Sequence, residues 1–348
     1  MPNNIQSEIQ GNLGIITLSR PKALNALTTD MCKGVTQLLQ DWEEDENIGA
    51  VLVRGAGGRA FCAGGDVVML HDSGKKDGKT AEEFWRIEYP LNELIQRYRK
   101  PYIALIDGIV MGGGVGLSVH GDYRIAGDDT LFAMPETGIG YFPDVGGTYF
   151  LPRLGLATGM WLGLTGARLK TAAVCDLGIA THYVPSGKHA ALTEALAKAK
   201  LDGTDAPVVK VIEKHAKKAA KADDTPGELG AFLGDNVADI MSALEEAETD
   251  WATKQHSILA SKSPIAMAVT HEALRRGAQM SFREAMSQEL NISMNFLKTQ
   301  DFYEGIRSQL IDKDRNPKWS HETAAKVTEA QVKRVFKEVA KPPLEFLP

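Results

Sequence analysis

The sequence predicts an α/β fold that continues into a helical C-terminal region. Through the first half of the 348 residues, β-branched runs alternate with helix-like segments, which is typical of parallel strands joined by crossover helices. After Val184 these strand signals stop, and Ala, Lys and Glu dominate. We therefore expect two domains, residues 1–190 and residues 191–348.

The first strand is expected at residues 14–19 (GIITLS), because this β-branched run ends just before a proline, which cannot continue a ladder. Hydroxyl and carboxylate side chains at residues 28–30 are suitable N-caps for a helix over residues 31–45. Further strands are expected at residues 50–55 and 102–108, with an inserted helix at residues 81–98 and a small-residue helix in GGGVGLSVHG after the last strand.

Composition excludes several classes of protein. Apolar residues make up 43% and charged residues 24%, as in compact globular proteins. A net charge of −6 argues against a nucleic-acid partner, which would require a basic face. The three cysteines, Cys32, Cys62 and Cys175, are too far apart for a disulfide framework or a CxxC metal site, which fits a reducing compartment.

No apolar run approaches the ~20 residues of a membrane helix, and the polar start MPNNIQSEIQGN does not resemble a secretion signal or a transit peptide. We therefore expect no membrane association. The expected location is cytoplasmic, or the mitochondrial matrix if the chain is a mature eukaryotic form.

Three glycine-rich segments carry the candidate chemistry: AFCAGGD (60–66), MGGGVGLSVHG (111–121) and MPETGIGYFPDVGG (134–147). The middle segment lacks the third glycine of a dinucleotide-binding GxGxxG, and His120 breaks the GxSxG elbow that would make Ser118 a nucleophile. Glycines at these places suit backbone N–H groups that closely approach a carbonyl oxygen, as in an oxyanion hole. Tight turns of an α/β protein are the simpler alternative.

The order of these segments resembles the crotonase (enoyl-CoA hydratase/isomerase) superfamily, and within it the hydrolases of 3-hydroxyacyl-CoA. The resemblance extends from RPKALNALT at residue 20 to DFYEGIRSQLIDKDRNPKW, which ends at Trp319. It implies a spiral core of stacked ββα turns covered by the helical C-terminal region. It also implies hydrolysis of a short branched 3-hydroxyacyl-CoA thioester. An enoyl-CoA hydratase or isomerase and a non-catalytic binding subunit are the alternatives.

The resemblance places the oxyanion-hole amides on Gly65 and Gly113. It assigns catalytic carboxyl groups to Glu136 and Asp144, although a loop-bonding and a turn-forming role are the simpler interpretations. Hydratases of the superfamily carry a further Glu where this chain has Gly116, so hydration, which uses a pair of carboxyl groups, is disfavoured. Glu136 acts either as general base on water or as a nucleophile that forms an anhydride.

The remaining assignments concern substrate contacts. The resemblance implies that Glu88 contacts the substrate, although Glu82, Glu83 and Glu93 lie on the same predicted helix. It implies that Lys22, Leu24 and Ala63 contact the CoA moiety, mainly through backbone groups, with plain surface charge as the alternative for Lys22.

No cofactor is expected, because CoA is part of the substrate. Neither is a metal expected, since His120, His182 and His256 lack metal-ligand spacing. The expected partner is an acyl-CoA, and a homo-oligomer is compatible with the resemblance. Asp66 is expected to cap the helix that follows it, and His120 to be a packed, hydrogen-bonded residue.

Overall fold

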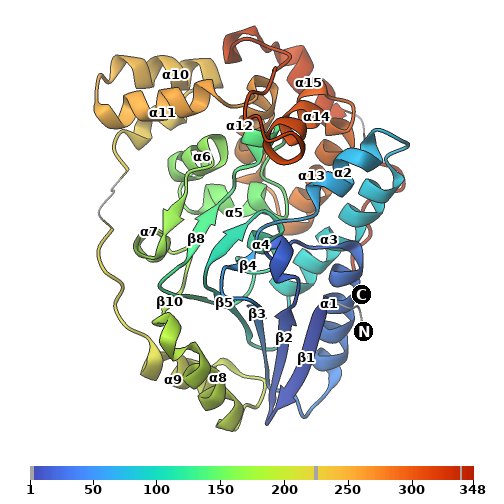
Figure 1. The fold of residues 1–348 in the computed structure, drawn as a ribbon, viewed down its shortest axis with the longest axis vertical. Coiled ribbons are helices and arrows are strands. Elements are labelled where there is room, and N and C mark those ends of the chain that lie inside the picture. Colours follow the sequence, from blue (N-terminus) through green and yellow to red (C-terminus); the bar gives the residue numbers. More distant parts are fainter. Residues whose placement is uncertain (1–3, 223–225, 338) are drawn as a thin grey trace.

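The computed structural model describes residues 4–222, 226–337 and 339–348. Its larger sheet has six strands in the order β1-β2-β3-β5-β7-β10 (Figure 1). Their bounds are β1 (Ile5–Gln10), β2 (Leu13–Leu18), β3 (Ala50–Gly55), β5 (Tyr102–Ile106), β7 (Tyr123–Ala126) and β10 (His182–Tyr183). The β1–β2 hairpin is antiparallel, and every other neighbouring pair is parallel.

A smaller sheet has the order β4-β6-β8-β9. Its strands are β4 (Ala60–Cys62), β6 (Ile109–Met111), β8 (Leu131–Ala133) and β9 (Leu169–Lys170). The consecutive pairs β3/β4, β5/β6 and β7/β8 each place their first strand in the larger sheet and their second strand in the smaller one. The chain therefore alternates between the two sheets, and each strand pair adds one strand to each of them. The predicted α/β class is confirmed.

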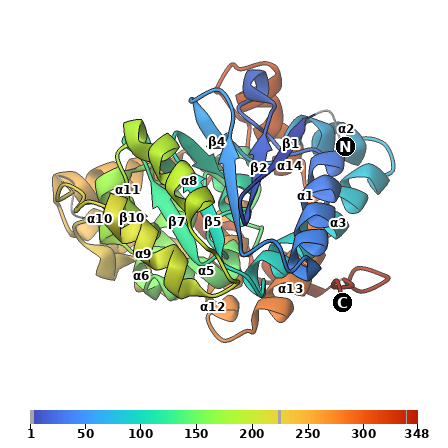
Figure 2. The same cartoon turned by 90° about the horizontal axis from the view of Figure 1, so that it is seen from below.

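Both faces of the larger sheet are buried, which explains its nearly continuous apolar strands. Along β2, Leu13 and Ile15 pack with α8 (His189–Lys198) and α9 (Asp205–His215), while Ile16 faces the main core on the other side. Figure 2 shows α8 and α9 against one side of the sheet. The alternation of strand side chains therefore divides the core in two.

The helices of the first half are α1 (Thr29–Glu44), α2 (Val67–Gly74), α3 (Lys79–Gln96), α4 (Gly113–Gly116), α5 (Gly147–Arg153), α6 (Leu156–Thr165) and α7 (Thr171–Asp176). Of these, α1 and α3 confirm predicted helices with small shifts in their bounds, whereas α5, α6 and α7 were not predicted. The hydroxyl of Thr28 caps α1 by accepting a hydrogen bond from the Met31 amide. The small-residue helix predicted in the glycine-rich segment is only the four-residue α4, which turns then follow.

The C-terminal region is helical, as predicted. It contains α10 (Val237–Glu246), α11 (Asp250–Ala260), α12 (Pro264–Gly277), α13 (Phe282–Phe296), α14 (Gln300–Ile306) and α15 (Glu329–Lys337). Helix α12 packs against α5 and α6, and α13 packs against α3 and α15 (Figure 1). The domain boundary near residue 190 stays a prediction. Within the described ranges, no helix has both the length and the apolar character needed to cross a membrane.

Candidate active site

Two glycine-bearing loops meet where the strands of the smaller sheet end. Gly64 follows β4 with φ +120°, and Gly112 follows β6 with φ +46°, both in the region that favours glycine. A Cβ placed on Gly113 would lie 3.3 Å from the Gly64 carbonyl carbon, and one placed on Gly64 would lie 4.0 Å from the Gly113 nitrogen. The structure therefore brings together the loops that carry the two predicted oxyanion-hole amides, those of Gly65 and Gly113.

Two carboxyl groups border the same loops. A Cβ on Gly113 would lie 2.7 Å from Oε1 of Glu88, and a Cβ on Gly112 would lie 3.2 Å from Oε1 of Glu136. Glu88 projects from α3, and Glu136 begins the short helix η2 (Glu136–Ile139). The structure therefore places both predicted acids at the glycine loops. Glu88 lies at Gly113, the first residue of α4, and Glu136 lies at Gly112, which precedes it.

Both of these carboxyl groups are buried, with exposed fractions of 2% for Glu88 and 6% for Glu136. Within the described residues, Glu88 Oε1 and Glu136 Oε2 have no hydrogen-bond partner. Burial, followed by the charge of Asp144, raises the pKa of both groups well above the usual value. Carboxyl groups held in this way are suited to proton transfer near neutral pH.

Asp144 is buried, close enough to Glu88 and Glu136 for its charge to raise the pKa of both, and is held by tyrosines. The Tyr89 hydroxyl donates a hydrogen bond of 2.8 Å to Asp144 Oδ2, and the Tyr141 hydroxyl lies 3.4 Å from the same oxygen. Ser293 Oγ of α13 lies 2.8 and 2.6 Å from these two hydroxyls. Burial raises the pKa of Asp144 to about 6, and the tyrosine hydrogen bonds only partly oppose this increase.

The turn after Asp144 is conformationally strained and is secured by Glu289. Val145 has φ +53°, which is unfavourable for a β-branched residue. Glu289 of α13 accepts hydrogen bonds from the backbone amides of Gly146 (2.7 Å) and Thr148 (3.0 Å) and from the Thr148 hydroxyl (2.5 Å). Burial raises the pKa of Glu289 to about 8 despite these bonds.

His120 holds the turn from its other side, because its Nε2 lies 2.7 Å from the Val145 carbonyl oxygen. The prediction that His120 is a packed, hydrogen-bonded residue is therefore confirmed, and burial lowers its pKa to about 4.

The acids that compete with Glu88 on α3 all form ion pairs elsewhere. Glu82 pairs with Arg86, Glu83 with Lys33, and Glu93 with both Arg97 and Arg283. Of these four acids, only Glu88 faces the glycine loops.

The position of Gly116 is closed to any larger side chain. A Cβ there would lie 2.8 Å from Asn92 Nδ2 and 2.8 Å from Val145 Cβ. Real Cβ atoms essentially never approach so closely. The carboxyl group that hydratases place here, according to the resemblance, has no room in this chain.

The predicted CoA-contacting residues lie beside the oxyanion loop. The Ala63 amide donates to the Leu24 carbonyl oxygen (3.0 Å), and the Leu27 amide donates to that of Gly64 (2.8 Å). Lys22 is exposed on the short helix η1 (Pro21–Ala23) at the outer end of this segment. Their contacts with CoA stay a prediction.

Asp66 begins the next helix, as predicted. Its side chain accepts a hydrogen bond from the Met69 amide at the N-terminus of α2 and pairs with Arg20 at 3.1 Å.

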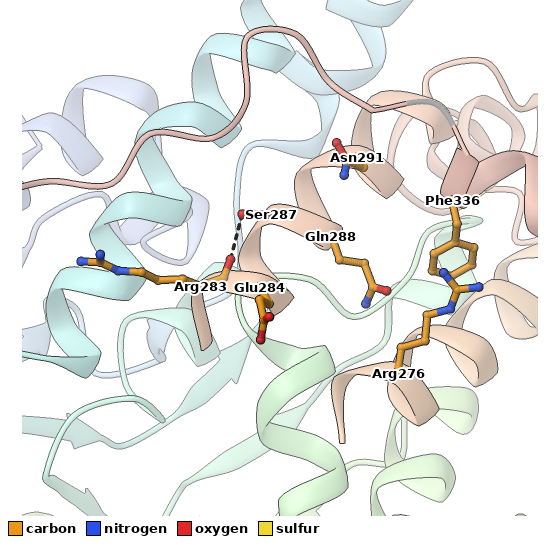
Figure 3. Close-up of a pocket in the computed structure, with 7 residues that line it drawn as sticks. All are labelled: Arg276, Arg283, Glu284, Ser287, Gln288, Asn291 and Phe336. Atoms are coloured by element: carbon orange, nitrogen blue, oxygen red, sulfur yellow. Dashed lines mark hydrogen bonds between the residues drawn. The ribbon is translucent and has the colours of Figure 1, made fainter. Parts of the chain in front are cut away.

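A surface hollow of about 420 Å³ between α12, α13 and α15 does not belong to this site (Figure 3). Its two arginines already have partners: Arg283 pairs with Glu93, and Arg276 pairs with Glu272 and lies over the ring of Phe336. In the described part of the chain, no three His, Cys, Asp or Glu side chains are grouped as metal ligands would be.

Sequence reasoning did not identify Tyr89, Asn92, Tyr141, Glu289 and Ser293. Helix α13 carried a signal that could have identified two of them. Polar residues recur there at a helical spacing that places them on the buried face. Glu289 and Ser293 are four residues apart, and both are fully buried.

Comparison with known proteins gives a consistent result. The family model described as "Enoyl-CoA hydratase/isomerase" matches residues 13–336. A Xenopus laevis protein named "3-hydroxyisobutyryl-CoA hydrolase, mitochondrial" is 46% identical over 334 residues, covering 94% of this chain and 86% of the relative. The Homo sapiens protein of the same name is 41% identical over 347 residues, covering 97% of this chain and 90% of the relative.

Solved structures support the same fold. A structure titled as a carnitinyl-CoA dehydratase from Mycobacterium thermoresistibile has a TM-score of 0.91 at 41% identity and covers 99% of both chains. A structure titled as an enoyl-CoA hydratase from Rhodobacter sphaeroides 2.4.1 has a TM-score of 0.86 at 34% identity, covering 99% of this chain and 100% of the other. The predicted crotonase-like core is thus confirmed.

Proposed function

The chain belongs to the enoyl-CoA hydratase/isomerase family, and from this premise we propose that it hydrolyses the thioester of 3-hydroxyisobutyryl-CoA to CoA and the free hydroxy acid. The smaller 3-hydroxypropionyl-CoA is proposed as a second substrate. The names of relatives that share 41–46% identity with the chain support a hydrolase. The observation that carries the proposal is the proximity of the two glycine loops to Glu136 and Glu88, with the Gly116 position closed.

In this proposal, the amides of Gly65 and Gly113 donate hydrogen bonds to the thioester oxygen as negative charge develops on it. Their loops are in contact, and Gly64 and Gly112, which have positive φ, place no side chain in the space between the loops. Loss of one such donor typically costs about 2.7–4 kcal/mol of transition-state stabilisation. Because a thiolate leaves readily, the delivery of water is the remaining requirement.

We assign the delivery of water to Glu136 and Asp144. Glu136 either takes a proton from the attacking water or attacks the thioester to form an anhydride that water then opens. Asp144, fixed by Tyr89 and Tyr141, holds the water and exchanges protons with it. Single turnover in ¹⁸O-water tests the anhydride route, because ¹⁸O enters the Glu136 carboxyl group only when water opens an anhydride at the Glu136 carbonyl carbon.

Hydration is the competing reaction, in keeping with the titles of the two structural neighbours. Addition of water to an enoyl group uses a pair of carboxyl groups in the superfamily, and the position of one of them is closed here by Asn92 and Val145. This favours hydrolysis over hydration.

The test is a screen of short acyl-CoAs that follows thiol release with a disulfide reagent and enoyl absorbance in parallel. We expect free CoA from 3-hydroxyisobutyryl-CoA without an enoyl intermediate. Enoyl formation without free thiol would identify a dehydratase. If no acyl-CoA were changed, a binding subunit would replace the proposed enzyme.

The proposal requires no resident cofactor, since CoA enters and leaves with the substrate. The curated relatives carry "mitochondrial" in their names, which supports a matrix location for a eukaryotic source. Self-association remains a proposal for measurement by sedimentation.

A further inference from the structure

Unpaired polar atoms are concentrated at the glycine loops. In the described ranges, eight buried side-chain nitrogen or oxygen atoms have no hydrogen-bond partner, and four of these belong to Glu88, Asn92 and Glu136. Folded proteins satisfy nearly all such atoms, so each exception requires an explanation. A cluster beside a reaction site indicates that a polar ligand completes it.

Asn92 is the least expected member of this cluster. Its side chain is fully buried, and neither Nδ2 nor Oδ1 has a partner within the described residues. An apolar residue of similar size would fill the same space without leaving a buried amide unsatisfied. Because the proposed reaction already has its carboxyl groups, Asn92 is not needed for proton transfer.

The placement of Asn92 relates it to the acyl group. Asn92 follows Glu88 by four residues on α3, so both side chains lie on one helix face. Glu88 contacts the start of α4 at Gly113, and Asn92 contacts its end at Gly116. These contacts are three residues apart, which is roughly 4.5 Å along a helix. Asn92 therefore lies within the reach of an acyl group whose carbonyl oxygen is held at Gly113.

We propose that the Asn92 amide binds the 3-hydroxyl of the acyl group and so selects hydroxylated over plain acyl chains. The hydroxyl donates to Oδ1 and accepts from Nδ2, which satisfies both orphaned atoms. An acyl chain without the hydroxyl leaves the amide unpaired, and this is how polar sites reject such analogues. This inference rests on the proposed function, whose substrate preference it would explain.

The experiment compares 3-hydroxyisobutyryl-CoA with isobutyryl-CoA, which differs only by the hydroxyl. We expect the wild type to prefer the hydroxylated substrate in kcat/KM. In Asn92→Leu this preference falls roughly 10- to 100-fold, because only the hydroxylated substrate loses its hydrogen bonds. Equal losses for both substrates, or an unchanged preference, would overturn the proposal.

A control and a second variant keep the test decisive. Thr270→Val removes another buried hydroxyl without a partner, on α12, and is expected to leave the preference unchanged. If Asn92→Leu does not fold, as judged by thermal unfolding, the same comparison is made with Asn92→Ala.

Calorimetric dissociation constants of the two acyl-CoAs, measured in a Glu136→Gln background, separate this inference from the proposed function. A hydroxyl preference in binding that Asn92→Leu abolishes supports the role of Asn92 even if no CoA is released. An equal affinity for the two ligands in the Glu136→Gln protein contradicts it.

Discussion

Burial raises the pKa of three carboxyl groups of the site, those of Glu88, Glu136 and Asp144, because it makes their charged forms unfavourable. A carboxyl group with a raised folded-state pKa stabilises the folded protein below its unfolded pKa. That stability is lost as the pH rises towards the folded value. The site therefore lowers the stability of the fold at the neutral pH where it would act, as functional sites often do.

Glu88→Gln should stabilise the folded protein, and more at pH 8 than at pH 5. The substitution removes a group whose ionisation the fold opposes above about pH 4.5. We therefore expect the gain in the free energy of unfolding to be larger at pH 8, where the wild-type carboxyl group is under pressure to ionise, than at pH 5. Denaturant unfolding at the two pH values measures this gain. Glu82→Gln, on the same helix, is the matched control and should give no gain in stability, because it removes a carboxyl group that pairs with Arg86.

Glu136→Gln should leave the protein folded, with a thermal midpoint no lower than that of the wild type, and reduce kcat for CoA release at least ~10²-fold, as expected for a lost general base or nucleophile. The amide has nearly the shape of the carboxyl group but cannot take a proton or attack. Stopped-flow thiol detection provides the measurement. A kcat close to that of the wild type would remove Glu136 from the reaction.

Asp144 gives a pH dependence of its own. With a pKa raised to about 6, its carboxylate form increases as the pH passes 6, so kcat/KM for the hydrolase should rise through this range. Asp144→Asn should abolish the rise at pH 6 and lower the plateau. The profile is measured from pH 5 to 8 with 3-hydroxyisobutyryl-CoA. If the rise survives in the variant, another group is responsible for it.

At the scale of elements, helices α3 and α13 position the reactive turn. Helix α3 supplies Glu88 and Tyr89, and α13 supplies Glu289 and Ser293. The turn at Val145 has a strained backbone. Glu289 offsets this strain by accepting hydrogen bonds from two backbone amides and one hydroxyl of the turn. Precise placement of Asp144 thus depends on a helix of the C-terminal region.

Glu289→Ala should therefore impair both folding and catalysis. It leaves the Gly146 and Thr148 amides buried without an acceptor, which we expect to cost about 2–4 kcal/mol in the free energy of unfolding. Thr148→Val is the milder control, because it removes only the hydroxyl bond and should cost about 1 kcal/mol. Urea unfolding and kcat are measured together, and a variant as stable and as active as the wild type would contradict the assigned role.

The sequence could predict elements and residues whose determinants lie close together in the chain. Strands β2, β3 and β5 and helix α1 follow from local periodicity and capping, and Glu136 and Asp144 lie eight residues apart in one motif. Strand β1 and the two- or three-residue strands of the smaller sheet were not identified, because such segments are too short to show a period. Glu289 could not be assigned, since its role depends on packing between residues about 140 positions apart.

At the scale of the whole molecule, the last residues of the chain are fastened to α3. Arg86 donates to the carbonyl oxygens of Pro342 (2.6 Å) and Pro343 (3.1 Å). Arg97 donates to those of Leu347 (3.1 Å) and Pro348 (2.6 Å). The helix that carries Glu88 and Asn92 is thus bound both to the core and to residues 342–348.

Removal of residues 341–348 should loosen α3 without unfolding the protein. We expect faster hydrogen exchange of the backbone amides in residues 79–96 and a several-fold lower kcat/KM, because Arg86 of α3 and Arg97 at its C-cap together lose four hydrogen bonds to carbonyl oxygens. Lys341→Ala, which keeps all four carbonyl groups, is the control. Unchanged exchange in α3 would show that the core alone holds the helix.

The distance along the chain between the strained turn and its acceptor also affects synthesis on the ribosome. Glu289 is added 143 residues after Gly146. At ~5–20 residues per second, this is a delay of roughly 7–30 s. During that delay, the nascent polypeptide already contains strands β1 to β8 but not the Glu289 carboxyl group that accepts hydrogen bonds from the Gly146 and Thr148 amides. Proteolytic sensitivity of arrested nascent chains should therefore persist in this turn until α13 has emerged.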